Sequence, residues 1–428
     1  MLRSLVLSVL VYGLILFGLL TLRGDILALS IPFVIYLLSG LLHAPREIKI
    51  TVQRELSLER TGEDVPVQVL LKIINQGGTL EDVLITDKIS SQLKVLDGSA
   101  HHLLYLGKNQ TVNMEYMVSG PRGYYPFPEI HVEARDQFGL VYQEATIPTF
   151  GQLFVLPAVL RLKNIVIRTR RTRVYSGTIP ARVGGPGVEF FGLREYQAGD
   201  SPRWINWRAS ARHLYSIYSN EFEQERVADV GIILDGRLKT NVFDKDHSLF
   251  EYSIQVAAAL ADVLLSQGNR VGLLNYGHYL RWTFPGYGKI QRERILQALA
   301  NAQVGSNSVF SELQYIPARL FPLHSQIILI SPLDADDEKV LVRLRARGYQ
   351  VMVVSPDPVS FESGYLPKSE SVRQATRLLR MERALLIQKL QRAGIQVLDW
   401  DVSQPFDQVV KRRLGRPPEL LRSIGGRI

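Results

Sequence analysis

Two uncharged apolar runs near the amino end constrain the fold of this chain more than any other feature. Residues 4–22 and residues 26–45 contain no charged side chain, and the polar residues 23–25 separate them. Each run has the roughly 20 residues that a helix needs to cross the hydrocarbon core of a bilayer. The sequence therefore predicts a transmembrane helical hairpin over residues 1–45. A cleaved signal peptide is the alternative for the first run, but no small-residue cleavage site leads from it into soluble sequence.

The charges beside these runs predict on which side of the membrane the rest of the chain lies. Arg3 precedes the first run, and Arg46, Lys49 and Arg54 follow the second, whereas the turn between them holds one Arg and one Asp. Basic residues favour the cytoplasmic side. We therefore expect a cell-membrane protein with two spans, both ends and the soluble domains being cytoplasmic. The absence of cysteine fits a reducing compartment but does not prove one.

The next segment, residues 46–158, has the pattern of an all-β domain. Short apolar runs such as 67–74, 83–85 and 111–118 alternate with turn signals such as Asn-Gln-Gly-Gly at 75–78. Repeated short strands joined by turns predict an antiparallel β-sandwich.

From residue 227 to the end, apolar strands alternate with helical stretches, which predicts a doubly wound α/β domain with a mostly parallel sheet. The fold class is thus multidomain, all-β plus α/β. A hairpin-like pair at 270–284 supplies one antiparallel edge strand. The expected strands are 230–234, 270–276, 327–330, 351–354 and 395–398, and the expected helices are 247–267, 290–302, 335–348 and 369–393. In the last helix we expect the leucines to face the sheet and the arginines to face water.

Between these domains, in residues 159–226, lies the most distinctive motif. Residues 187–212 read GVEFFGLREYQAGDSPRWINWRASAR, which resembles the defining pattern of the domain of unknown function 58 family, with Asn206 for the usual Asp and Arg208 for the usual Lys. The residues that carry this signature are Glu189, Phe190, Gly192, Arg194, Tyr196, Gly199, Asp200, Arg203, Asn206, Trp207, Arg208 and Arg212. Two interpretations of the signature segment, residues 187–212, remain open. Its aromatic and charged residues form either a structural clamp that holds the linker to the next domain or a docking surface.

The family resemblance also implies that the α/β domain is similar to the von Willebrand factor type A domain, which can hold Mg²⁺ through an Asp-x-Ser-x-Ser loop. Here the loop has Asp235, Arg237 and Lys239, so two hydroxyl ligands are replaced by cations. By spacing, Asn307 or Ser308 falls at the family's loop threonine, and Asp334 falls at its third-loop Asp. We predict a degenerate site with no metal and no cofactor, Asp334 being the remaining candidate ligand.

No nucleotide-binding P-loop, HExxH metal motif or GxSxG nucleophile elbow occurs in the sequence. The resemblance implies a non-enzymatic membrane-anchored adaptor or scaffold that works with a MoxR-type AAA+ ATPase in assembling or activating protein complexes. Its predicted partners are the lipid bilayer and this ATPase, with no specific nucleic acid. The alternatives are a metal-dependent enzyme of unknown reaction, or a basic protein that binds nucleic acid or anionic lipid through the charge excess of +9.

Overall fold

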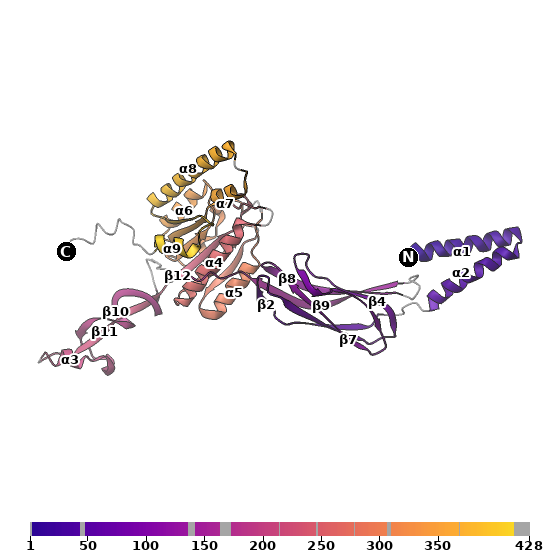
Figure 1. The fold of residues 1–428 in the computed structure, drawn as a ribbon. Coiled ribbons are helices and arrows are strands. Elements are labelled where there is room, and N and C mark those ends of the chain that lie inside the picture. The colour runs from indigo at the N-terminus through magenta and orange to yellow at the C-terminus, as the bar shows by residue number, and fades with distance from the viewer. Residues whose placement is uncertain are drawn as a thin grey trace. The chain divides into compact units, whose positions relative to one another are not determined.

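The structure is a computed structural model of the 428-residue chain. It describes residues 2–42, 48–135, 142–162, 173–213, 215–244, 247–277, 279–305, 310–367 and 369–414. The chain divides into two units, Met1–Leu156 and Pro157–Ile428, and each is described here by itself (Figure 1).

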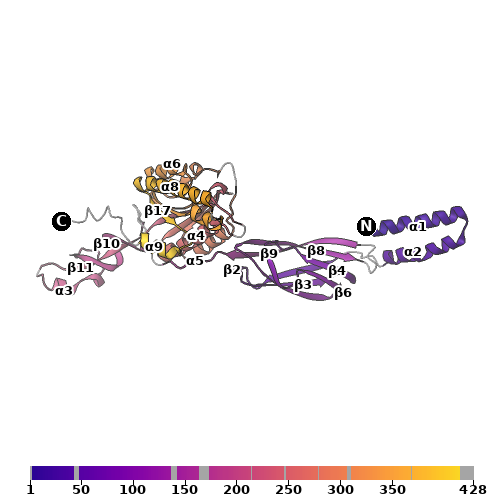
Figure 2. The same ribbon diagram turned by 45° about the horizontal axis from the view of Figure 1, so that its top comes forward.

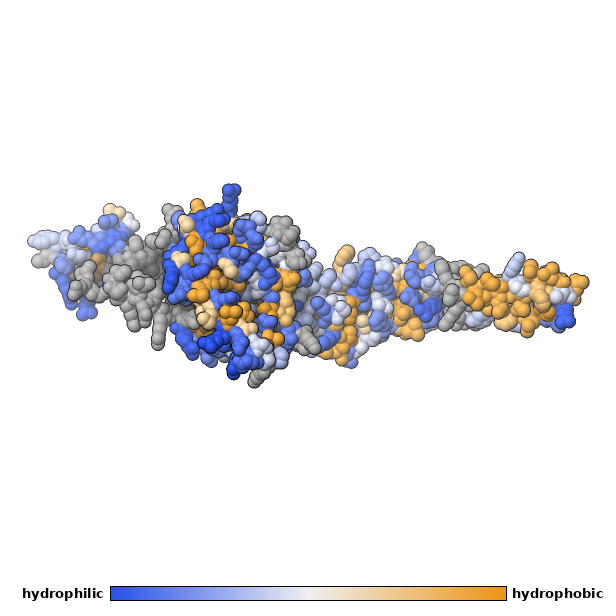
Figure 3. All heavy atoms as spheres, turned by 90° about the horizontal axis from the view of Figure 1, so that it is seen from above, coloured by the Kyte–Doolittle hydropathy of each residue, from blue (hydrophilic) through white to orange (hydrophobic). Residues whose placement is uncertain are grey.

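The first unit begins with two apolar helices, α1 (Leu2–Thr21) and α2 (Gly24–Leu42), which lie side by side (Figures 1 and 2). Gly18 permits this close packing, because a Cβ there would lie 2.8 Å from the Leu27 side chain. Most of the large apolar side chains on both helices are exposed, Leu20 by 75%, and Figure 3 shows this end of the molecule in orange.

By length and composition, one helix in the part of the chain that the structure describes could cross a membrane: α4, Leu249–Ser266. It is 72% buried, which marks it as a core helix. The first two helices hold shorter apolar stretches, Leu5–Thr21 and Gly24–Gly40. These stretches are consistent with membrane association.

The rest of the first unit consists of two β-sheets that share one core. Alternate residues of β3, Val67, Val69, Leu71 and Ile73, are buried, as expected for strands with one face toward a core. All strand pairs in the two sheets are antiparallel except the short pair β2–β9. One sheet has the order β1 (Ile50–Leu56), β3 (Val67–Asn75), β7 (Thr111–Ser119), β5 (Lys94–Gly98), and the other has β2 (Arg60–Gly62), β9 (Tyr142–Leu156), β8 (Gly123–Arg135), β4 (Leu80–Asp87), β6 (His101–Leu106).

A buried ion pair lies within this β domain. Arg54 Nη2 lies 2.5 Å from Asp87 Oδ1, with both side chains fully buried, and Tyr116 Oη donates to Asp87 Oδ2 at 2.6 Å. Burial raises the pKa of Tyr116, and the Asp87 charge adds to the effect. Arg54 is therefore an internal cation of the β domain.

The α/β domain of the second unit spans residues 229–414 and is built on a six-stranded sheet. Its order is β14-β13-β12-β15-β16-β17, parallel throughout except that β14 pairs antiparallel with β13 at one edge. The expected antiparallel edge strand is therefore confirmed. The strands are β12 (Asp229–Asp235), β13 (Arg270–Tyr276), β14 (Arg281–Gly286), β15 (Gln326–Ile330), β16 (Gln350–Pro356) and β17 (Gln396–Trp400).

Helices cover both faces of this sheet. Figure 2 shows α6 and α8 on one face and α4, α5 and α9 on the other. Every residue of β15 is buried, which explains its uninterrupted apolar sequence. Besides α4, the helices are α5 (Gly288–Ala300), α6 (Asp337–Ala346), α7 (Pro358–Tyr365), α8 (Glu370–Arg392) and α9 (Phe406–Leu414).

Helix α8 does not bury the face that its sequence suggested. Its buried side chains are Ile387 and Leu390, both in its second half, whereas Leu378 and Leu385 are each 59% exposed. Arg383 points inward instead, with Nη2 2.7 Å from Asp399 Oδ1 and further bonds to the ends of β15 and β16. The expectation that the leucines face the sheet and the arginines face water holds for Leu390 but was wrong for Leu378, Leu385 and Arg383. Arg383 faces inward because it satisfies carbonyl and carboxylate groups at the sheet edge.

Candidate functional site

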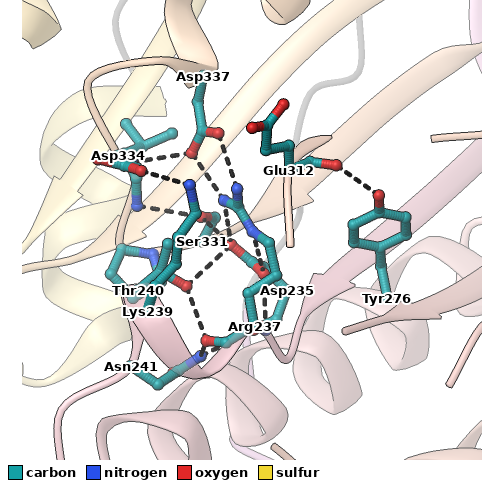
Figure 4. Close-up of polar contacts among 12 residues, drawn as sticks. Asp235, Arg237, Lys239, Thr240, Asn241, Tyr276, Glu312, Ser331, Asp334 and Asp337 are labelled. Carbon is teal, nitrogen blue, oxygen red and sulfur yellow. Dashed lines mark hydrogen bonds and ion pairs between the residues drawn. The ribbon is translucent and has the colours of Figure 1, made fainter. Parts of the chain in front are cut away.

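The carboxyl ends of β12 and β15 meet the first turn of α6 at a buried cluster of charged and polar side chains (Figure 4). Asp235 is the last residue of β12, Ser331 follows β15, and Asp337 opens α6. All three side chains are at most 2% exposed. In open α/β sheets this edge is where ligands commonly bind.

The centre of the cluster is Arg237, which is 1% exposed. Its Nε and Nη2 donate to the two carboxylate oxygens of Asp235 at 2.9 and 2.7 Å. Its Nη1 and Nη2 donate to the two oxygens of Asp337 at 3.0 and 2.7 Å. One guanidinium is thus held in a fork by two carboxylates, the geometry in which Arg pairs most strongly.

Hydroxyl groups satisfy the remaining acceptor capacity of Asp235. Ser331 Oγ donates to Asp235 Oδ2 at 2.6 Å and Thr240 Oγ1 donates to the same atom at 3.2 Å. The loop after β12 packs closely, since a Cβ at Gly277 (φ +145°) would lie 2.3 Å from the carbonyl carbon of Gly236. Close packing of backbone against backbone therefore fixes the direction in which Arg237 enters the cluster.

For Arg237 and for Asp337, burial and neighbouring charges shift the pKa in opposite directions. Burial lowers the pKa of Arg237, but Asp235 and Asp337 outweigh it and the net shift is upward, so the guanidinium stays charged. Burial raises the pKa of the Asp337 carboxyl, and the neighbouring Arg237 opposes that rise. Because Arg237 forms ion pairs with both Asp235 and Asp337, neither carboxylate is a free base for the Ser331 hydroxyl.

The two other residues expected at this site lie apart from its centre. Lys239 Nζ lies 2.7 Å from Asp334 Oδ2, and both side chains are more than a third exposed. Asp337 is the acid that pairs with the buried Arg237, whereas sequence spacing had selected Asp334, which pairs with the more exposed Lys239. The backbone turn explains the difference, because Leu333 is left-handed (φ 70°) and the Asp334 amide donates to Asp337 Oδ2. Asn307 and Ser308 lie outside the described residues.

The signature segment forms part of a second structure, a hairpin of β10 (Arg173–Glu195) and β11 (Tyr218–Val227). The connection between the strands contains a 3₁₀ turn, Pro202–Trp204, and a short helix, α3, Trp207–Ser210. Gly192 pairs with Glu221 in the ladder, and Gly199 takes φ +113° in the turn that follows β10, a conformation that suits glycine.

One ion pair orders that turn. Arg194 Nη2 lies 2.5 Å from Asp200 Oδ1, and the Gln197 amide donates to Asp200 Oδ2 at 2.9 Å. The hydrogen bond from Arg194, and then the one from Gln197, lower the pKa of Asp200. Tyr196 Oη adds a bond to the Asp200 carbonyl oxygen at 3.0 Å.

The contacts of Asn206 account for one departure from the family pattern, in which Asp is usual at this position. Its Oδ1 accepts from the Ala209 amide at 2.9 Å as the N-cap of α3, and its Nδ2 donates to Asn220 Oδ1 at 2.8 Å. An aspartate could cap the helix equally well, but it would have no amide to donate to Asn220.

Most of the remaining signature side chains face outward. Trp207 is 70% exposed and Phe190 is 61% exposed. Arg203, Arg208 and Arg212 are exposed as well, and none of the three has a carboxylate partner within the described part of the chain. The side chain of Glu189 lies outside that part. Trp207 and Phe190 are thus not buried within the hairpin itself.

Comparison with known proteins identifies the family. Residues 192–358, from within the signature segment to the start of α7, match the model for the protein of unknown function DUF58. Residues 192–358 of the chain belong to the DUF58 family. This match begins within the hairpin and covers the buried Arg237 cluster.

Two solved structures are distant matches to parts of the chain. One is a CARDB domain from Pyrococcus furiosus, 14% identical, covering 26% of this chain and 97% of that one with a TM-score of 0.19. Another is a FixG-related protein from Vibrio parahaemolyticus, 11% identical, covering 26% of this chain and 98% of that one with a TM-score of 0.18. No curated protein matches this chain. Similarities at these levels carry no functional argument.

Proposed function

We propose that this protein is a non-enzymatic adaptor, anchored in a membrane, that works by binding other proteins. The observation that carries the proposal is the buried guanidinium of Arg237, held by Asp235 and Asp337 at the sheet edge where an α/β enzyme would place its chemistry. A cation fixed by the protein's own chain pairs with both carboxylates and leaves neither available to a metal ion.

We further propose that the α/β domain is of the von Willebrand factor type A kind with its metal loop altered. The sheet order with a single antiparallel edge strand supports this, as does the position of Asp235 at the carboxyl end of β12. In this proposal Arg237 takes over the electrostatic role of a divalent ion, because both present positive charge to converging oxygen atoms.

The membrane anchor in this proposal is the pair α1 and α2. Their exposed apolar side chains, such as Val9 at 63% and Leu20 at 75%, would lie in contact with water in a soluble protein. Removal of that surface from water favours a bilayer. The soluble domains are proposed to be cytoplasmic. A topology reporter fused after Ile428 that is active only outside the cytoplasm would rule this orientation out.

The proposed partner is a MoxR-type AAA+ ATPase, and the proposed contact is the exposed part of the signature segment. Trp207 is the natural anchor of such a contact, since exposed Trp and Arg residues are the types that dominate binding energy at interfaces. The exposed Arg208 and Arg212 lie close to it in sequence.

The test is direct binding of the purified ATPase to the full chain in a mild detergent. Trp207→Ala should weaken binding roughly tenfold or more, in line with a loss of about 2 kcal/mol at a hot spot. Phe284→Ala is the matched control, because Phe284 is an aromatic residue 76% exposed on β14 and outside the signature segment. An ATPase that does not bind the parent, or that binds both variants as it binds the parent, would exclude this function.

A further inference from the structure

A groove lies beside the first half of α8 and is unrelated to the buried cluster. It has a volume of about 770 Å³ and separates α8 from the chain that follows α7. Leu366 and Pro367 line one side, and Val372, Met381 and Ala384 of α8 line the other. A hollow with apolar walls of this size can accept several side chains.

An apolar stripe on α8 continues from the groove. Leu378, Met381 and Leu385 follow one another at spacings of three and four residues, which places them on one side of the helix. Each is nearly 60% exposed. Met381 belongs to both the stripe and the groove lining. Figure 3 looks onto the side of the domain that carries α8 and shows apolar atoms among hydrophilic ones there. A connected apolar surface of this kind marks an interaction site.

Arginines border the same groove. Arg373 is already paired, since its Nη2 lies 2.6 Å from Glu370 Oε2. Arg377 and Arg380 are exposed, and among the residues that the structure describes neither has a carboxylate partner. The groove therefore offers apolar walls and two uncompensated positive charges.

We propose that the groove and the stripe bind an acidic amphipathic helix of a partner protein. Its apolar side chains fill the hollow and cover Leu378 and Leu385, and its carboxylates pair with Arg377 and Arg380, in the helix-in-groove mode. The concave shape favours a protruding helix over a flat bilayer surface. The inference rests on the proposed adaptor function and adds to it the chemistry of a partner.

The probe is a fluorescent helical peptide of about 18 residues with leucines along one face and glutamates beside them. The control is the same peptide with lysine in place of each glutamate. Anisotropy with the full chain in neutral detergent should show binding of the acidic peptide, and binding of the lysine peptide at least roughly tenfold weaker. The affinity for the acidic peptide should fall as salt is added.

Variants locate the site. Arg377→Glu/Arg380→Glu and, separately, Met381→Asp should each weaken binding of the acidic peptide by roughly tenfold or more. The control is Lys289→Glu/Arg294→Glu, which reverses two exposed basic residues on α5 of the same domain and should leave binding unchanged.

Two results would overturn the proposal. One is an acidic peptide that fails to bind the parent or binds the groove variants equally well. The other is protection of α8 from hydrogen exchange when the chain is moved from phosphatidylcholine to phosphatidylglycerol nanodiscs, which would assign the surface to lipid. If either occurs while the ATPase still binds the parent, the groove proposal fails and the adaptor function stands.

Discussion

Replacing Arg237 by Met tests the central electrostatic argument, because Met keeps the apolar stem and removes the charge. Asp235 would keep its bonds from Ser331 and Thr240. The Asp337 side chain would keep its bond from the Asp334 amide and lose both bonds from the guanidinium. Stranding a buried charge in this way costs about 3–5 kcal/mol. Arg237→Met should lower the free energy of unfolding of the α/β domain by that amount at neutral pH.

The loss of unfolding free energy in the α/β domain can be measured by hydrogen exchange of the amides in β12 and β15, with the full chain in detergent. Since 1.4 kcal/mol corresponds to tenfold, exchange should accelerate roughly a hundredfold to a few thousandfold. Arg343→Ala removes an exposed arginine from α6 and is the matched control, expected to stay within about 0.5 kcal/mol of the parent.

The stability defect of Arg237→Met should depend on pH because of the Asp337 carboxyl. Burial already raises the pKa of its carboxyl in the parent, and loss of Arg237 removes the opposing effect, so the pKa should rise further. A carboxyl with a raised pKa in the folded state destabilises the fold as pH rises above the ordinary value of about 3.9. The defect of Arg237→Met should therefore shrink as pH falls, and adding Asp337→Asn should recover much of the stability at neutral pH. A defect that is independent of pH and persists with Asp337→Asn would refute the reasoning.

Three further predictions concern other contacts. The carboxyl of Asp200, followed by NMR, should titrate below about 3.9, so that its contribution to order in the turn is lost as pH falls through that lowered pKa; Arg194→Ala should move the midpoint upward. Asn206→Ala should accelerate exchange of the Ala209 amide in keeping with the loss of a cap worth about 1 kcal/mol, whereas Asn206→Asp should not. Tyr116→Phe should destabilise the β domain by about 1.5–3 kcal/mol through the lost bond to Asp87, as measured by exchange in β3 and β7, whereas Tyr105→Phe, at an exposed tyrosine of β6, should have no such effect.

The sequence predicted the α/β strands well because burial on both faces leaves an unmistakable pattern. All five residues of β15 are apolar or buried polar, and the expected 327–330 lies inside its observed bounds, Gln326–Ile330. Helix α7 was not predicted, because its eight residues, Pro358–Tyr365, are too few to establish a helical period. Helix α8 was placed correctly in the chain, but its buried side was not. An amphipathic pattern identifies an apolar face without saying what covers it.

The candidate site was predictable only in part, for a related reason. Asp235 and Arg237 are two residues apart, and the end of a buried strand singled them out. Asp337 lies 100 residues from Arg237 in sequence, and spacing selected Asp334 among the acids near the start of α6. The left-handed Leu333 decides among them, and no residue type at position 333 signals such a turn.

The arginines of this chain fall into two groups that differ in what balances their charge. Arg54, Arg237 and Arg383 are at least nine-tenths buried, and each is held by carboxylates of its own domain. Burial without such partners would cost several kcal/mol for each charge, so these three are committed to the fold. Arg208 and Arg212 near Trp207, and Arg377 and Arg380 beside the groove, are exposed and lack carboxylate partners in the described part of the chain. Their charges are available to a partner without disturbing the core, and both sets lie beside exposed apolar side chains. Arginine thus has two roles in this chain. Buried arginines form ion pairs in the interior, and exposed arginines carry charges available for binding on two separate surfaces.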